Sequence, residues 1–174
     1  VVILVVATPL FWQILAPYQK SRIISFVDPT KDPMGSGYHS IQSMIAVGSG
    51  KLFGRGLGKG VQTQLDFLPE RHTDFIFAAV SEEMGFAGSM LVIGGLFFIL
   101  LKLTKFIENA VSPAARAFLS GVFLTLFVQV VIHIGMNIGL LPITGVPLPL
   151  VSAGGSSLLA TMIILGMALG ARKS

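Results

Sequence analysis

The sequence contains no cysteine, and this absence removes several kinds of site from consideration. Disulfide frameworks, thiolate metal sites and cysteine nucleophiles all need a residue that the 174-residue chain lacks. Charged residues are also few, at 11%, whereas 53% of the residues are hydrophobic and the mean hydropathy is +0.82. This composition predicts a membrane protein. The net charge of +4 fits the usual basic bias of cytoplasmic loops, with contact to anionic membrane lipids as the alternative and nucleic acid not expected as a partner.

The chain lacks a start methionine and the basic region of a signal peptide, although its first residues are apolar. We therefore expect the C-terminal part of a longer protein, with an incomplete first helix. A helix that crosses a membrane needs about 20 mostly apolar residues. The prediction is an all-α membrane protein, a polytopic transmembrane bundle of about four helices in one domain. The expected helices are approximately 1–16, 75–104, 115–140 and 156–171.

Basic residues near the helix ends predict the orientation. They flank the loop between the second and third helices and follow the fourth, which places them on one side of the membrane. By the positive-inside rule that side is cytoplasmic. The outer loops are then residues 17–74 and 141–155, because long loops translocate largely regardless of their charge. The orienting residues are Lys102, Lys105, Arg116, Arg172 and Lys173.

The first outer loop, residues 17–74, is too long for a featureless connection. Residues 38–50 have apolar side chains at helical spacing, among them Ile41, Met44 and Ile45. We expect a large, partly helical extracytoplasmic loop in which this piece is a half-buried or re-entrant helix.

A glycine-rich stretch, "GRGLGKG", resembles a phosphate loop but fails the test for one. Gly58-Lys59 is followed by Gly60 where the Walker motif needs serine or threonine, and Phe53 stands where its first glycine belongs. Two interpretations stay open. Backbone N–H groups with Arg55 and Lys59 could hold a pyrophosphate, or the loop is flexible with solvated cations.

Asp74 lies between the polar segment "LPERHT" and the apolar run "FIFAAV", which places its carboxylate at the outer membrane interface. Partial burial there would raise its pKa, whereas Arg71 or a nearby lysine would lower it. A carboxylate at this depth is a candidate functional site. The alternative is structural, with Thr73 or Asp74 capping the following helix.

Two further acids, Glu82 and Glu83, fall inside the same helix, where an unpaired carboxylate facing lipid would cost several kcal/mol. They must face protein, water or a cation, or be protonated. His72 beside these acids suggests a metal, but the spacing matches no ligand motif, and we favour a polar cluster over a metal site.

The third helix carries three polar residues at i, i+4 and i+8, namely Gln129, His133 and Asn137. We expect this stripe to face the bundle interior. Interhelical hydrogen bonding is favoured, and a proton path or a substrate groove stays open.

The second outer loop, "PITGVPLPLVSAGGSS", cannot be a regular helix because of its prolines and glycines. Irregular backbone near membrane depth must be buried in protein or line a water-filled cavity. Ser156 or Ser157 is expected to cap the last helix, whose N-terminal amides would favour an anion.

Two long segments resemble the shape, elongation, division and sporulation (SEDS) family, and within it the elongation branch more than the division branch. They are "YHSIQSMIAVGSGKLFGRGLGKGVQTQLDFLPERHTDFIFAAVSEEMGFAGS" and "NIGLLPITGVPLPLVSAGGSS". The resemblance covers the chain from about Leu15 onward. It implies the C-terminal four of about ten helices in a multi-pass protein of the bacterial cytoplasmic membrane.

The resemblance also implies a function, namely a peptidoglycan glycosyltransferase that polymerises lipid II on the outer membrane face for cell elongation and shape. The acid of "HTDF", Asp74, is the implied catalytic residue, and Asp66 is an implied upstream position for activation or site geometry. Implied partners are a class B penicillin-binding transpeptidase and other elongation-complex membrane proteins. No cofactor is certain, although a divalent cation fits the pyrophosphate. The substrate-binding candidates are Arg55, Lys59, Asp66, Glu70, Arg71, His72 and Ser156.

Two other functions stay open. A flippase for the lipid-linked precursor would need polar groups through the whole membrane depth, whereas these gather toward one face apart from Gln129 and the pair Glu82 and Glu83. If the protein is instead a non-catalytic scaffold of the cell-wall machinery, replacing Asp74 would leave sugar polymerisation intact.

Overall fold

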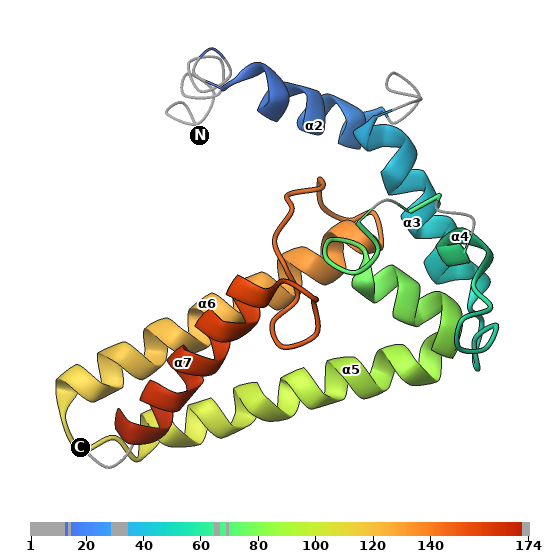
Figure 1. Ribbon diagram of the computed structural model, residues 1–174. Helices are drawn as coiled ribbons and strands as arrows, with labels where there is room; N and C mark the ends of the chain where they lie inside the picture. Colours follow the sequence, from blue (N-terminus) through green and yellow to red (C-terminus); the bar gives the residue numbers. More distant parts are fainter. Residues whose placement is uncertain (1–12, 14, 29–34, 65–66, 69, 172–174) are drawn as a thin grey trace.

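The computed structural model describes residues 13, 15–28, 35–64, 67, 68 and 70–171, and these form helices and connecting loops without a strand. The all-α prediction is therefore confirmed (Figure 1). The expected first helix, residues 1–16, lies almost wholly outside the described residues, as does Asp66. The helices are α2 (Pro17–Val27), α3 (Ser36–Ser49), α4 (Val61–Gln64), α5 (Ile76–Glu108), α6 (Pro113–Asn137) and α7 (Gly155–Ala171).

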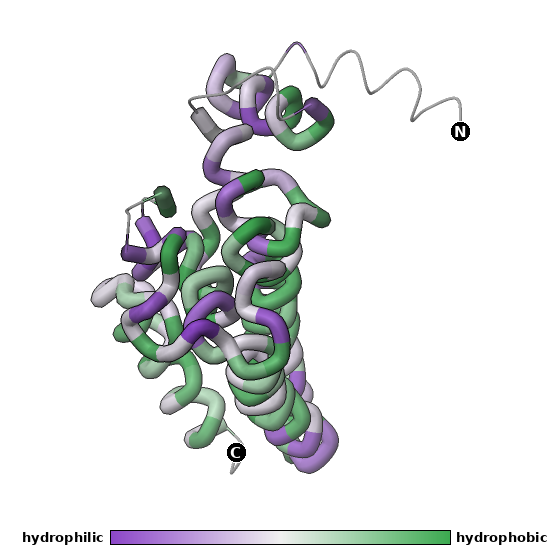
Figure 2. The backbone as a smooth tube through the Cα atoms, turned by 90° about the vertical axis from the view of Figure 1, so that its right-hand side faces the viewer, coloured by the Kyte–Doolittle hydropathy of each residue, from purple (hydrophilic) through white to green (hydrophobic). Residues whose placement is uncertain are grey.

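Helices α5 and α6 form an antiparallel pair, and α7 packs alongside (Figure 1). Both α5 and α6 are long and apolar enough to cross a membrane, whereas α7 is apolar but has only 17 residues. Hydrophilic residues gather at the tip where α5 turns into α6 (Figure 2). Buried side chains tie the three helices together near this tip, including Leu103 of α5, Leu119 of α6 and Ala168 of α7.

Helix α6 begins and ends with recognisable signals. The hydroxyl of Ser112 accepts a hydrogen bond from the amide of Ala115 at 3.1 Å, and Pro113 occupies the first helical position. At the other end Gly139 takes a positive φ of 75°. The amide of Leu140 then donates to the carbonyl of Gly135 at 2.8 Å, which closes a Schellman motif and turns the chain into the segment predicted as the second outer loop.

Helix α5 is broken at Gly85, whose φ of 67° and ψ of −162° are not helical. Figure 1 shows the sharp bend that follows. A break frees backbone groups that need new partners when they are buried. The glycine-rich loop supplies them, because the amides of Arg55 and Gly56 donate to the carbonyls of Glu82 and Glu83, both at 3.0 Å.

The exchange runs in the other direction as well. The amide of Phe86 donates to the carbonyl of Lys51 at 2.8 Å, and the amide of Ala87 donates to that of Leu52 at 3.1 Å. Gly54 faces this break with a φ of 78°, and a Cβ there would overlap the carbonyl oxygen of Glu83. The loop therefore follows the helix break closely, and only glycine fits at this point.

Helix α3 packs through its small residues. Ser43 and Ala46 are fully buried, whereas Met44 and Ile45 of the predicted apolar face are 38% and 46% exposed. At its end, a Cβ on Gly50 would overlap the carbonyl of Ser81 in α5. Small side chains let α3 approach α5 and α6 closely, as in other membrane helix pairs.

Candidate functional site

Asp74 belongs to a tight turn, Glu70–Phe75, that precedes α5. Glu70 adopts a φ of 56°, and its carbonyl accepts the amides of Thr73 and Asp74 at 3.0 Å and that of Phe75 at 3.3 Å. Phe75 is buried in a small apolar cluster with Ala46 of α3 and Ala78 of α5. The turn is thus closed by its own backbone and anchored by an aromatic side chain.

Three successive carbonyls of this turn are held by the last residue of α6 and by the segment that follows α6. The amide of Ala153 donates to the carbonyl of His72 at 2.8 Å, and the hydroxyl of Ser152 donates to that of Thr73 at 2.9 Å. The Asn137 side chain donates to the carbonyl of Asp74 at 3.0 Å. Segments far apart in the sequence therefore fix the backbone that carries the carboxylate.

Asn137 is the centre of this arrangement and is fully buried. Its side-chain NH₂ also donates to the carbonyl of His133 at 2.8 Å, and its side-chain oxygen accepts the amide of Ala78 at 3.2 Å. The hydroxyl of Ser43 in α3 donates to the main-chain oxygen of Asn137 at 2.9 Å. Interhelical hydrogen bonding, the favoured interpretation of the polar stripe, is confirmed for this residue.

His133, one turn earlier, is also fully buried. Its Nδ1 lies 2.8 Å from the carbonyl oxygen of Val146 in the second outer loop. Its Nε2 has no hydrogen-bond partner among the described residues. The His133 ring of the polar stripe therefore contacts the loop between α6 and α7 at Val146, the residue after Gly145.

The Asp74 carboxylate is half-buried, and its surroundings act on its pKa in opposite directions. Burial raises the pKa of Asp74, the neighbouring charge of Glu70 raises it further, and Arg22 of α2 lowers it. Gly145, at a φ of 73°, lies directly beside the group, since a Cβ there would be 3.5 Å from Oδ2. A raised pKa suits a carboxylate that takes a proton near neutral pH.

The structural alternative for Asp74, helix capping, is wrong. Phe75 occupies the N-cap position of α5, and no side chain makes a capping hydrogen bond there. The hydroxyl of Thr73 turns back instead, donating to the carbonyl of Glu70 at 3.2 Å. The tight turn displaces both predicted caps from the helix end.

The other candidates divide into two groups. Glu70, Arg71 and His72 share the turn with Asp74, and Arg71 donates to the carbonyl of Thr63 and, at 3.3 Å, to Nε2 of His72. Arg55 and Lys59 instead lie in the loop at the α5 break. This break is at Gly85, eleven residues after Asp74 in the chain. A helix rises about 1.5 Å per residue, so this break is on the order of 15 Å from the turn.

The glycine-rich loop itself is not a free cradle of amides. Those of Gly54, Arg55, Gly56 and Lys59 all donate to carbonyls within the protein. Four of the seven amides of residues 54–60 are thus already bonded, which leaves the side chains of Arg55 and Lys59 as the loop's main candidates for contact with a pyrophosphate.

Glu82 faces protein, as one of the expected alternatives requires. It is fully buried, and its carboxylate accepts the amides of Gln62 at 2.9 Å and Thr63 at 3.1 Å. The hydroxyl of Thr63 adds a third bond at 2.7 Å. This acid therefore holds α4 and the glycine-rich loop against α5.

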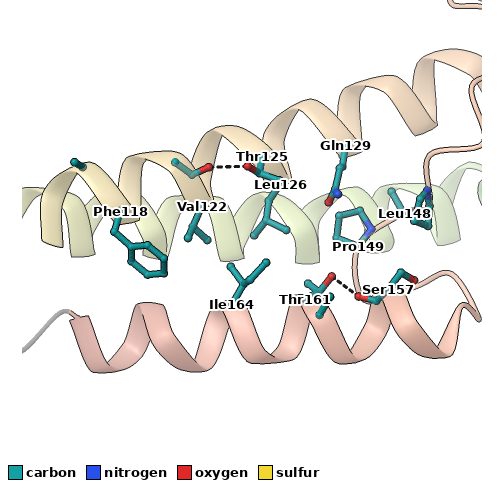
Figure 3. Close-up of a pocket in the computed structure, with 14 residues that line it drawn as sticks. Phe118, Val122, Thr125, Leu126, Gln129, Leu148, Pro149, Ser157, Thr161 and Ile164 are labelled. Carbon is teal, nitrogen blue, oxygen red and sulfur yellow. Dashed lines mark hydrogen bonds between the residues drawn. The ribbon is translucent and has the colours of Figure 1, made fainter. Parts of the chain in front are cut away.

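The last helix begins earlier than expected. α7 starts at Gly155, so Ser156 and Ser157 lie within its first turn and the predicted serine cap is wrong. The hydroxyl of Ser157 donates to the carbonyl of Gly154 at 2.9 Å. Ser157 and Gln129 line an apolar pocket of about 420 Å³ between α6 and α7 (Figure 3).

A second hollow lies nearer to Asp74. It is a groove of about 680 Å³ between α2 and the start of the second outer loop, lined in part by Tyr18, Gln19, Arg22 and Thr144. Sequence reasoning missed Arg22 because its only visible signal was a basic residue in a helical stretch. Ser152 and Gly145 carry no sequence signal for the site, because only the fold brings them to the turn.

The fold and the surroundings of Asp74 define the class of protein. This is a helical membrane protein in which a half-buried carboxylate is held at the start of a membrane-crossing helix by buried polar ties. The FtsW/RodA/SpoVE family, described as cell cycle protein, matches residues 1–174. The chain therefore belongs to this family, which is the SEDS family expected from the sequence.

Curated relatives agree with this assignment. The chain is 45% identical over 168 residues to the peptidoglycan glycosyltransferase MrdB of Escherichia coli K12, covering 96% of this chain and 45% of the relative. It is 43% identical over 155 residues to the peptidoglycan glycosyltransferase RodA of Treponema pallidum, covering 89% of this chain and 36% of that one. The chain thus spans less than half the length of these relatives.

Two solved structures are also similar. One, from a peptidoglycan synthase complex that coordinates polymerization and crosslinking, has a TM-score of 0.71 at 38% identity and covers 93% of this chain and 44% of its own. The other is a mutant of the rod shape determining protein RodA of Thermus thermophilus, with a TM-score of 0.57 at 39% identity. It covers 60% of this chain and 35% of its own.

Proposed function

We propose that the protein containing this chain is a peptidoglycan glycosyltransferase that polymerises lipid II at the outer face of the bacterial cytoplasmic membrane, for cell elongation and shape. The observation that carries the proposal is the half-buried Asp74 carboxylate on a turn whose carbonyls are fixed by α6 and the second outer loop. The names of the similar proteins support the reaction class, since both name a peptidoglycan glycosyltransferase.

In the proposed reaction, Asp74 is the general base. The 4-hydroxyl oxygen of the acceptor sugar forms a bond to the anomeric carbon of the donor, and the bond from that carbon to the pyrophosphate oxygen breaks. The hydroxyl proton goes to Asp74 and the electron pair of the broken bond leaves with the pyrophosphate. General base catalysis contributes roughly 100- to 10,000-fold to such a step.

The remaining assignments follow from this reaction. Glu70, Arg71 and His72 adjoin the base in the chain and are proposed substrate contacts, and Asp66 and Ser156 stay proposed substrate contacts. Cationic side chains stabilise the leaving group, with a divalent cation as the candidate cofactor for the same charge. The proposed partners are a class B penicillin-binding transpeptidase and other elongation-complex membrane proteins, supported by the similar synthase complex.

The test uses the full-length protein with its transpeptidase partner and fluorescent lipid II. Asp74→Asn is compared with wild type and with Glu108→Gln, an exposed acid at the far end of α5, at equal folding and partner binding. We expect glycan strands from wild type and Glu108→Gln but none from Asp74→Asn. Normal strands from Asp74→Asn would remove the base and favour a scaffold, and lipid II translocation without strands in wild type would favour a flippase.

A further inference from the structure

The groove between α2 and the second outer loop has the composition of an anion site. Arg22 lies in its wall together with the polar side chains of Tyr18, Gln19 and Thr144. Its other lining is apolar, including Pro142 and Ile143. A guanidinium offers planar, paired donors that match phosphate oxygens, and hydroxyl and amide groups beside it can complete such a contact.

The groove is next to the catalytic turn. Ile143, in its wall, packs against the apolar cluster that includes Phe75, the residue after Asp74. A small cavity continues from the groove past Arg22 toward Ser40 of α3. The charge of Arg22 also acts on the Asp74 carboxylate, which shows that the two groups are within electrostatic reach.

The other two arginines before α5 are placed differently. The Arg71 guanidinium is bonded to the carbonyl of Thr63 and to His72. Arg55 donates to the hydroxyl of Ser49 at 3.3 Å, beside the break in α5. Of these three arginines, Arg22 is the one whose charge acts on the proposed base while it lines an open groove.

We infer that Arg22 binds the pyrophosphate of the lipid-linked donor in the groove between α2 and residues 142–144. This rests on the proposed function and assigns the leaving group a site. A base and a cation on opposite sides of one reacting carbon would accept the proton and the departing charge in the same step. The polyprenyl tail would then extend from the groove into the lipid.

The experiment measures binding of farnesyl pyrophosphate to the full-length protein in nanodiscs with its transpeptidase partner. Inorganic pyrophosphate and farnesol are separate arms, which distinguish a lipid-linked group from a free anion or a bare chain. The variants are Arg22→Gln, Arg22→Lys and, as the matched control on the same helix, Lys20→Gln. We expect Arg22→Gln to weaken farnesyl pyrophosphate binding by about 10-fold or more, with Lys20→Gln within about 2-fold of wild type.

A second readout separates this role from a structural one. Because Arg22 lowers the pKa of Asp74, its removal should shift the acidic limb of the pH–rate profile to higher pH, and Arg22→Lys should restore it in part. Glu70 is the other charged group that acts on Asp74 and is unchanged in every variant.

The outcomes separate the two proposals. Equal binding by Arg22→Gln and Lys20→Gln, in a wild type that makes glycan strands, would overturn the pyrophosphate site and leave the function standing. Arg22-dependent binding in a protein that makes no strands would overturn the function and leave the site standing. Binding of inorganic pyrophosphate alone would overturn the assignment to a lipid-linked group.

Discussion

The side chain of Asn137, at the end of α6, donates a hydrogen bond of 3.0 Å to the main-chain carbonyl of Asp74, 63 residues earlier in the chain. The same amide group binds α5 through Ala78, and α3 reaches the Asn137 carbonyl through Ser43. One buried residue therefore sets the position of the carboxylate relative to three helices. Neither a charge nor a motif marks it for this role.

Replacing Asn137 with alanine should both destabilise the protein and lower its activity. The change leaves the buried amide of Ala78 and the carbonyl of Asp74 without their partner, at a cost of about 1–3 kcal/mol for each unsatisfied group. Asn109→Ala, at an exposed asparagine at the end of α5, is the control. Thermal unfolding in detergent, followed by intrinsic fluorescence, measures the difference. Equal melting temperatures for both variants would contradict a central role for Asn137.

The pKa of Asp74 predicts opposite effects on activity and stability. Because the base must be deprotonated to act, activity should fall as the pH decreases. The raised pKa of Asp74 places this fall at a higher pH than for an ordinary carboxylate. In the window between the unfolded and the folded pKa, the folded state binds more protons, so stability is lost as pH rises. Asp74→Asn cannot lose a proton and should lose no stability there.

The measurement for Asp74→Asn is chemical unfolding of the full-length protein at several pH values. We expect the mutant to be at least as stable as wild type above the folded pKa while polymerisation is lost. A mutant that is less stable than wild type at every pH would show that the carboxylate has a structural role.

Gly54 and Gly58 both need a positive φ, so comparing alanine substitutions at the two positions distinguishes the cost of backbone strain from the cost of a lost contact. Gly54 and Gly58 have φ values of 78° and 67°, but only Gly54 meets the backbone of α5, while nothing lies within 4 Å of Gly58. Gly58→Ala should cost about 1–2 kcal/mol from its left-handed backbone alone. Gly54→Ala should cost clearly more, because the loop must leave the α5 break. Similar melting temperatures for the two variants would argue against the docked loop.

Removing the buried carboxylate of Glu82 should release α4 and the glycine-rich loop. Glu82→Gln turns one of the two acceptor oxygens into a donor that faces the amide of Gln62 or the groups of Thr63. We expect the free energy of unfolding to decrease by about 2–3 kcal/mol and proteolysis within residues 50–64 to become faster. Glu108→Gln is the control. Cleavage of Glu82→Gln as slow as that of the control would contradict the role of Glu82 in holding α4 against α5.

The sequence predicted much of the helical framework. Long apolar runs without charges identified α5, α6 and α7, and the observed bounds of α6, Pro113–Asn137, lie within three residues of the expected ones at each end. Hydropathy works here because a membrane-crossing helix must be apolar over its whole length. The break at Gly85 was not predicted, because a glycine inside an apolar run is also common in unbroken membrane helices.

The site was predictable where the chemistry is local. Asp74 could be selected because an acid followed by "FIFAAV" is unusual, whereas Arg22 and Gly145 reach it only through folding of segments 52 residues before and 71 residues after it. The cap assignments failed for a physical reason. A hydroxyl or a carboxylate near a helix start can bond elsewhere, and Thr73 does so with Glu70.

The break in α5 is filled rather than empty, and this decides how the two halves of the helix can move. A hinge needs backbone that is free to change its φ and ψ angles. Here four hydrogen bonds join the residues on both sides of Gly85 to residues 51–56, so bending at this point would break these contacts as well. The bend in α5 is therefore rigid and not a hinge. A displacement of the membrane-crossing half of α5 would be transmitted to the turn that carries Asp74.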